Sequence, residues 1–184
     1  MKAVIVFCFL TAGAAWSQTQ QGVLSQWEVR RLLQNLEEQA RHLSPIVEQV
    51  QPAAWASQGA PPAYQDQWVH TKVGLQDLLS DSAALQKKPE RLPLALDTYF
   101  RMVALENVLG SFLEGVRKYQ DAELARRIQD VINENSANRD TLRQYVQDLA
   151  LQKEQEFTVA DEEAQRCRGM LMHETNTTGK KKRD

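Results

Sequence analysis

Apolar residues recur at intervals of three and four along most of the chain, which is the spacing of one face of an α-helix. No segment alternates apolar and polar residues with the period of two that a half-buried strand needs. The spacing predicts four helices joined by short connections, within about residues 25–50, 61–88, 89–119 and 121–173. Short connections make consecutive helices antiparallel. The predicted fold is all-α, an up-down antiparallel four-helix bundle with an extended C-terminal helix.

Local signals mark where these helices begin and end. Ser25 and Glu28 form a capping box, in which each side chain can bond the other residue's backbone amide. Pro45 removes one helical hydrogen bond and is expected to kink or break the first helix. Residues 51–61 contain Pro, Gly and Ser and are predicted to be a loop. Asp121 can cap the fourth helix.

The last helix is longer than the helix it would pack against. The third helix starts near residue 89, and in an antiparallel hairpin that start lies opposite about residue 151 of the fourth helix. Residues 25–151 therefore form the predicted bundle, and residues 152–173 form a helical arm beyond it. The arm keeps an apolar stripe and is the candidate interface: Phe157, Ala160, Ala164, Cys167 and Leu171. An apolar stripe of this length is unfavourable in water, so the arm either folds back or meets another chain. We favour a projecting arm.

Two segments of the last helix leave its direction and its end undecided by the sequence. The polar stretch 133–138 could bend the helix and redirect the arm. Residues 174–184 contain no large apolar side chain and end in a basic run, so they are predicted to be a disordered basic tail.

The first residues have the pattern of a secretory signal peptide. Lys2 precedes a short apolar run that ends in small residues, which predicts a cleaved signal at residues 1–17. Cleavage after Ser17 is preferred, cleavage after Ala15 is the alternative, and an uncleaved anchor is a further alternative. Residues 18–24 are a polar lead. No second apolar stretch exists, so no transmembrane segment remains after cleavage. The predicted location is extracytoplasmic: secreted or periplasmic.

Charge and cysteine content exclude several classes of partner and site. The 184 residues contain 22 Lys+Arg and 24 Asp+Glu, so no basic field indicates nucleic-acid binding. One of the two cysteines lies in the leader, which excludes a disulfide framework and a cysteine zinc site. Cys167 lies between two arginines. It suggests an intermolecular disulfide or a free thiol, and the alternative is a small packed residue.

One polar cluster is predicted inside the bundle. Glu106 falls among apolar positions of the third helix, and the hairpin geometry places it near Asn135, Asn138 and Arg139 of the fourth. A buried carboxylate needs a partner. We interpret these four residues as a buried polar layer that fixes helix register. The alternatives are an acid–base or ligand site, and simple solvent exposure. Trp27 and Trp68 are assigned to the core, and Trp55 to one end of the bundle.

No sequence motif predicts catalytic, metal-binding or cofactor-binding residues. The favoured hypothesis is a non-catalytic exported helical bundle that acts through protein–protein contact, with the arm as its interface. The partner is another protein or a second copy in a homodimer. One alternative is a bundle that binds a small ligand or metal at the Glu106 layer. Another is a holdase-like chaperone that grips unfolded clients with the arm.

Overall fold

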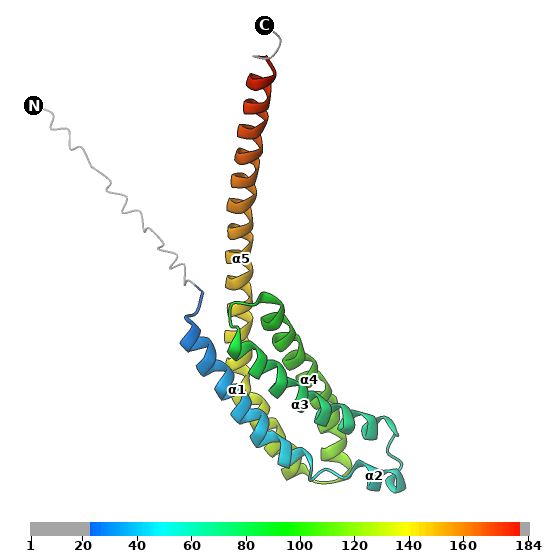
Figure 1. Cartoon of the computed structure of the whole chain (residues 1–184). Helices are drawn as coiled ribbons and strands as arrows, with labels where there is room; N and C mark the ends of the chain where they lie inside the picture. The colour runs from blue at the N-terminus through cyan, green and yellow to red at the C-terminus, as the bar shows by residue number, and fades with distance from the viewer. Residues whose placement is uncertain (1–22, 181–184) are drawn as a thin grey trace, which may run out of the picture.

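The structure, a computed structural model, describes residues 23–180, with side chains described through residue 172 (Figure 1). Five α-helices and one 3-10 turn (Ala56–Gln58) make up this part of the chain: α1 (Gln26–Val47), α2 (Pro52–Trp55), α3 (Ala63–Lys87), α4 (Leu92–Tyr119) and α5 (Ala122–Lys180). No strand occurs within these residues. The predictions of an all-helical protein and of a long C-terminal helix are confirmed. The signal peptide predicted at 1–17 lies outside the described residues.

The predicted caps form. Glu28 accepts a hydrogen bond from the Ser25 amide at 2.8 Å, and Ser25 accepts from the Glu28 amide at 3.5 Å. Asp121 accepts from the Glu123 amide at 2.9 Å at the start of α5. Pro45 lies inside the last turn of α1, and the helix ends two residues later, at Val47. The helix is therefore not broken at Pro45, although it is a few residues shorter than the apolar spacing predicts.

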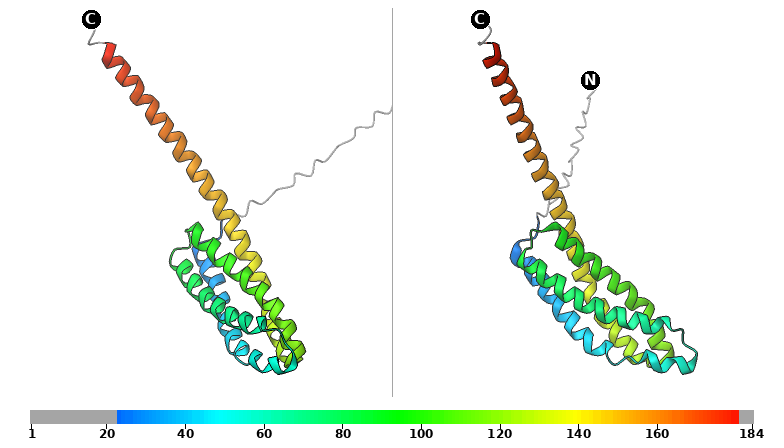
Figure 2. Two further views of the ribbon diagram at one scale, coloured as in Figure 1. Left: turned by 90° about the vertical axis from the view of Figure 1, so that its right-hand side faces the viewer. Right: turned by 45° about the vertical axis from the view of Figure 1, so that its right-hand side comes forward.

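The four long helices pack in a ring, each against two neighbours (Figure 2). α3 packs against α1 and α4, while α5 packs against α4 and α1. Hydrogen bonds between helices show that neighbours run in opposite directions. Between α1 and α3, Val47 bonds Trp68 and Glu37 bonds Gln86, so residue numbers fall on α1 as they rise on α3. Gln39 of α1 bonds Asn138 of α5, and Gln49, just past the end of α1, bonds Arg127, so α1 and α5 also run in opposite directions.

The segment predicted as a loop at 51–61 folds into α2 and the 3-10 turn, which corrects that prediction. Proline at the first helical position favours the turn. Trp55 on α2 is 1% exposed and stacks on Phe112 and Tyr119 of α4. Gln120 accepts hydrogen bonds from the Gln51 amide at 2.8 Å and from the Trp55 indole at 3.3 Å. Burial of one large aromatic side chain therefore orders this segment and closes the end of the bundle.

Of the tryptophans assigned to the core, Trp27 departs from that prediction fully and Trp68 in part. Trp27 is 62% exposed. It lies two residues before the buried Val29, about 200° away around the helix, so it falls on the opposite face. Trp68 is partly buried, and its indole donates to the Val47 carbonyl at 3.0 Å.

α5 extends well past the bundle as a single continuous helix (Figure 1, Figure 2). It contains no break at 133–138, so the polar stretch does not interrupt it. Leu149 is the last buried side chain among those described on this helix. The backbone stays helical through Lys180, where the sequence predicts a disordered tail from residue 174; residues 181–184 are outside the described range. No proline follows residue 169, and the next glycine is Gly179, so no strong helix breaker precedes the last turn.

Candidate interaction site: the C-terminal arm and the Glu106 layer

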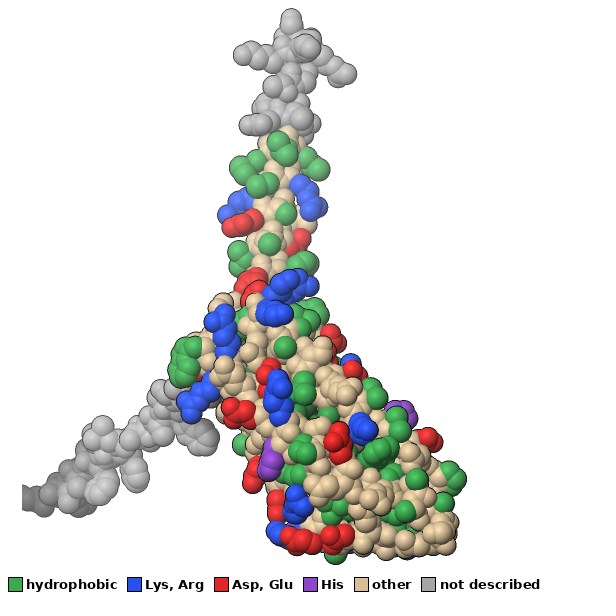
Figure 3. Space-filling model, turned by 60° about the horizontal axis from the view of Figure 1, so that its bottom comes forward, with side chains coloured by type: hydrophobic (Ala, Val, Ile, Leu, Met, Phe, Trp, Pro, Cys, Tyr) green, Lys and Arg blue, Asp and Glu red, His purple; other side chains and the backbone are tan. Residues whose placement is uncertain are grey.

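The arm (residues 152–173) presents its apolar stripe to solvent. Phe157 is 73% exposed and Leu171 is 63% exposed. Ala160 and Cys167 are also exposed, and Ala164 is half-buried. Alternating spacings of three and four place these five side chains on one side of the helix. Figure 3 shows hydrophobic side chains between charged ones along the arm, clear of the bundle.

The stripe continues the face that α5 buries in the bundle. Leu142, Val146 and Leu149 are buried, and each lies three or four residues from the next. The same spacing passes through Lys153 to Phe157. The arm therefore carries a core-type face into a region where no other described helix covers it. This is the position at which a further helix would extend the packing.

Several exposed apolar residues of the arm escape the sequence prediction. They lie off the stripe, so the three- and four-residue spacing does not include them. They are Leu151, just before the arm, and Val159, Met170 and Met172 within it. Their exposed fractions are between 56% and 66%. The signal that could have found them is the apolar content of the arm as a whole. Met170 and Met172 widen the apolar surface around Leu171.

Charges on the arm are segregated along its length. Acidic residues gather before Ala164, and Arg166 and Arg168 follow it. Near the bundle, Lys153 pairs with Glu156 at 2.7 Å. Hydrogen bonds from Lys153 and Gln152 lower the pKa of the Glu156 carboxyl. Pairs of this kind at exposed helical positions stabilise the helix slightly, which supports a helix that has little tertiary contact.

The structure brings together the four residues predicted as a polar layer, at the edge of the bundle. Arg139 donates from Nη1 to Glu106 Oε2 at 2.9 Å. This hydrogen bond is the main cause of a raised Arg139 pKa. All four side chains are half-buried, so the layer is less enclosed than predicted. Glu106 Oε1 is buried and accepts no hydrogen bond from the described residues.

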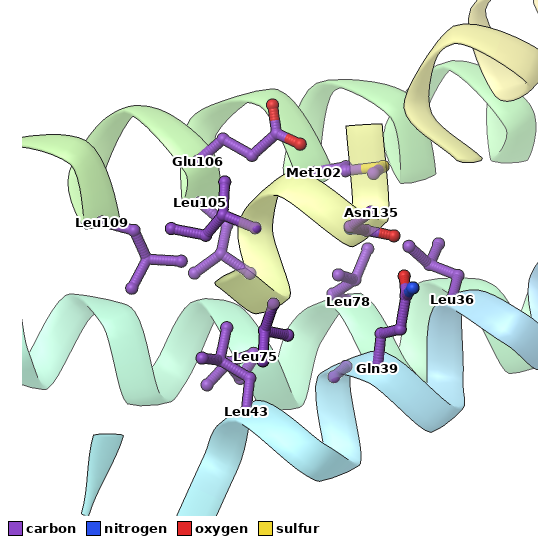
Figure 4. A pocket seen from close by; sticks show the side chains of 13 residues that line it. Leu36, Gln39, Leu43, Leu75, Leu78, Met102, Leu105, Glu106, Leu109 and Asn135 are labelled. Carbon is purple, nitrogen blue, oxygen red and sulfur yellow. The ribbon is translucent and has the colours of Figure 1, made fainter. Parts of the chain in front are cut away.

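The two asparagines form a second part of this layer, and Gln39 joins them from α1. Asn138 donates to Gln39 Oε1 at 3.0 Å and to Asn135 Oδ1 at 3.2 Å. Sequence reasoning missed Gln39, because the predicted pairing concerned only the third and fourth helices. Gln39, Glu106 and Asn135 line a cavity of about 20 Å³ that is otherwise mainly apolar (Figure 4). That volume has room for about one water molecule.

Within the described residues, no group of three or more His, Cys, Asp and Glu side chains is placed to hold a metal ion. In the same part of the chain, no helix combines the length and the apolar character needed to cross a bilayer. No protein family model, characterised protein or solved structure matches this chain. The arm and the Glu106 layer are therefore the features of this chain from which a function can be inferred.

Proposed function

We propose that this protein is an exported, non-catalytic up-down four-helix bundle that acts by binding another protein through its C-terminal arm. One observation carries the proposal: a core-type apolar face continues beyond the bundle on a helix where Phe157 and Leu171 are mostly exposed. Leaving such a stripe in water is unfavourable, and a helix packed onto it would remove that cost. Export is proposed from the signal pattern at residues 1–17.

The arrangement favours recognition of a helix over recognition of an extended strand. The stripe is narrow and helical, and it offers side chains with the spacing used in helix-to-helix packing. A strand needs an exposed backbone edge to pair with, and the backbone donors and acceptors of an α-helix bond within the helix. The proposed activity is therefore assembly through helix packing.

Site-specific photo-cross-linking in the producing cells tests this proposal. A photoreactive amino acid at position 157 reports on the stripe, and one at position 162 reports on the opposite side of the same helix. We expect protein adducts from position 157 and few from position 162. Adducts from neither position, or equal yields from both, would contradict a contact made by the stripe.

A second candidate, binding of a small ligand at the Glu106 layer, is favoured by one observation, the buried Oε1 atom that accepts no hydrogen bond from described residues. The cavity of about 20 Å³ is too small for an organic cofactor unless the helices move apart. Native mass spectrometry of protein purified from its own cells tests this candidate. A bound mass that disappears in Glu106→Leu would support it, and a mass equal to that of the bare chain would count against it.

A further inference from the structure

The stripe on the arm has the periodicity of a two-stranded coiled coil. Phe157, Ala160, Ala164, Cys167 and Leu171 are separated by three, four, three and four residues. That alternation matches the core positions of a heptad repeat, which a second helix covers on one side. The small side chains in the middle of the stripe allow two helices to approach closely. This spacing indicates that one further helix packs along the arm.

The charges indicate which helix fits. Residues 153–163 carry one lysine and five carboxylates, a net charge of −4. Residues 164–172 carry Arg166 and Arg168 and no carboxylate. In an antiparallel pair, the acidic segment of one copy faces about residues 168–178 of the other, which carry one arginine and one carboxylate and have no net charge with histidine neutral. A copy running in the same direction places like charges together, which is unfavourable.

We infer that the partner of the arm is a second copy of this chain, with the two arms paired antiparallel. This inference rests on the proposed function of the arm and goes further by naming the partner. In a register that packs most of the stripe against itself, Ala164 of each copy packs against Cys167 of the other, while Phe157 lies across from position 174, at the edge of the stripe. Ala160 of each copy packs against Leu171 of the other. A symmetric pair of this kind closes on itself and forms no filament.

The same register pairs charges beside the stripe. Asp161 of each copy lies across from Arg168 of the other, which gives two symmetric ion pairs. Both residues are exposed on the described arm, so they are free to reach across. The helix of the second copy ends, at Lys180, level with Leu151 of the first. The arm is therefore long enough for the pairing, and the two bundles lie at opposite ends.

A parallel pair makes the opposite electrostatic prediction. Heptad geometry then puts Asp161 of one copy across from Glu156 of the other, so two carboxylates repel. It also puts the two Cys167 side chains face to face. In the antiparallel pair the Cα atoms of the two Cys167 residues are about 10 Å apart, which is too far for a disulfide. Charge reversal and oxidation therefore distinguish the two orientations.

Light scattering of the purified mature protein over a range of concentrations tests the inference. We expect a dimer whose dissociation constant rises about ten-fold in Asp161→Arg, because two weak attractions become repulsions. The double variant Asp161→Arg, Arg168→Asp restores the dimer. Glu162→Arg makes the same change of charge on the far side of the helix and should leave the dissociation constant unchanged. Mild oxidation should give no covalent dimer.

Two results would overturn the inference. A tighter dimer in Asp161→Arg, or efficient cross-linking through Cys167 on oxidation, would show parallel arms. A monomer at every concentration would remove the second copy as partner. If the protein is a monomer but position 157 gives adducts whose mass differs from that of two chains, the arm binds a different protein and the proposed function stands. If position 157 gives no adducts, both the proposed function and the inferred pairing of arms are wrong.

Discussion

At the scale of single residues, the end of the bundle near α2 depends on a close approach between aromatic rings and Gly115. A Cβ atom at Gly115 would lie 2.6 Å from Tyr64 and 2.9 Å from Trp55. Trp55 and Tyr64 meet edge to face, with ring centroids 5.6 Å apart. The absence of a side chain at residue 115 therefore allows α3 and α2 to close on α4 at this point.

Two alanine substitutions on α4 should have opposite effects on stability. Gly115→Ala should lower the free energy of unfolding by about 1–3 kcal/mol, because the methyl group forces the rings apart. Gly110→Ala should raise it by about 0.5–1 kcal/mol, because this exposed position has no atom near its would-be Cβ and alanine favours the helix. Urea unfolding followed by circular dichroism measures both. Equal effects at the two positions would contradict the close packing at Gly115.

Tyr145 links stability to alkaline pH. Its hydroxyl donates to the Pro89 carbonyl, and burial raises its pKa to about 12 from an ordinary value of 10. The folded protein therefore keeps this proton at pH values where the unfolded chain releases it. Its contribution to stability is complete below about pH 10 and declines as the pH rises towards 12.

Comparison with a variant isolates this effect from other groups that titrate in the same range. The urea midpoint should fall between pH 9.5 and about 11.5, and the fall should be smaller in Tyr145→Phe. The variant also loses the hydrogen bond to Pro89, so it should be less stable than the parent at neutral pH. A variant with the same alkaline decline as the parent would show that Tyr145 does not titrate on unfolding.

At the scale of elements, α5 has two parts with different sources of stability. From its cap at Asp121 to Leu149, it is held by buried contacts with α1 and α4. Beyond Leu149, the described side chains are exposed or at most half-buried, and local pairs such as Lys153 with Glu156 support the helix. Most of the stability of helices in proteins comes from tertiary packing, so the arm should be less stable than the bundle unless a partner covers it.

Removal of residues 152–184 should therefore leave the bundle folded. We expect the urea midpoint of the bundle to change little in the truncated chain, because none of the described side chains that are removed is buried. The measurement is unfolding of both chains followed by the fluorescence of the buried Trp55 and its neighbours. A large loss of stability would mean that the arm folds back on the bundle, and that would contradict its projecting position.

At the scale of the whole molecule, a globular bundle and a long exposed helix are joined without a hinge (Figure 1). The near balance of 22 basic and 24 acidic residues conceals the strong separation of charge along the arm. Because one continuous helix crosses the junction, it sets the direction of the arm relative to the bundle. Pairing of two arms would consequently fix the relative positions of the two bundles as well.

The sequence by itself determined the local features of this protein. Three- and four-residue spacing identified the helices, and the Ser25 and Asp121 caps placed two of their starts, because these signals depend on neighbouring residues alone. It also identified the length mismatch that makes the last helix project. The apolar stripe was found in the same way.

Only the tertiary structure decided which side chains are covered by distant parts of the chain. It buried Trp55 within a short helix that the Pro, Gly and Ser content had suggested was a loop, because contacts with α4 outweigh local propensity. It exposed Trp27, whose face of α1 no other described helix covers. It added Gln39 to the polar layer, since contact between α1 and α5 joins residues about one hundred positions apart. Burial depends on the whole packed arrangement, and local spacing does not contain that information.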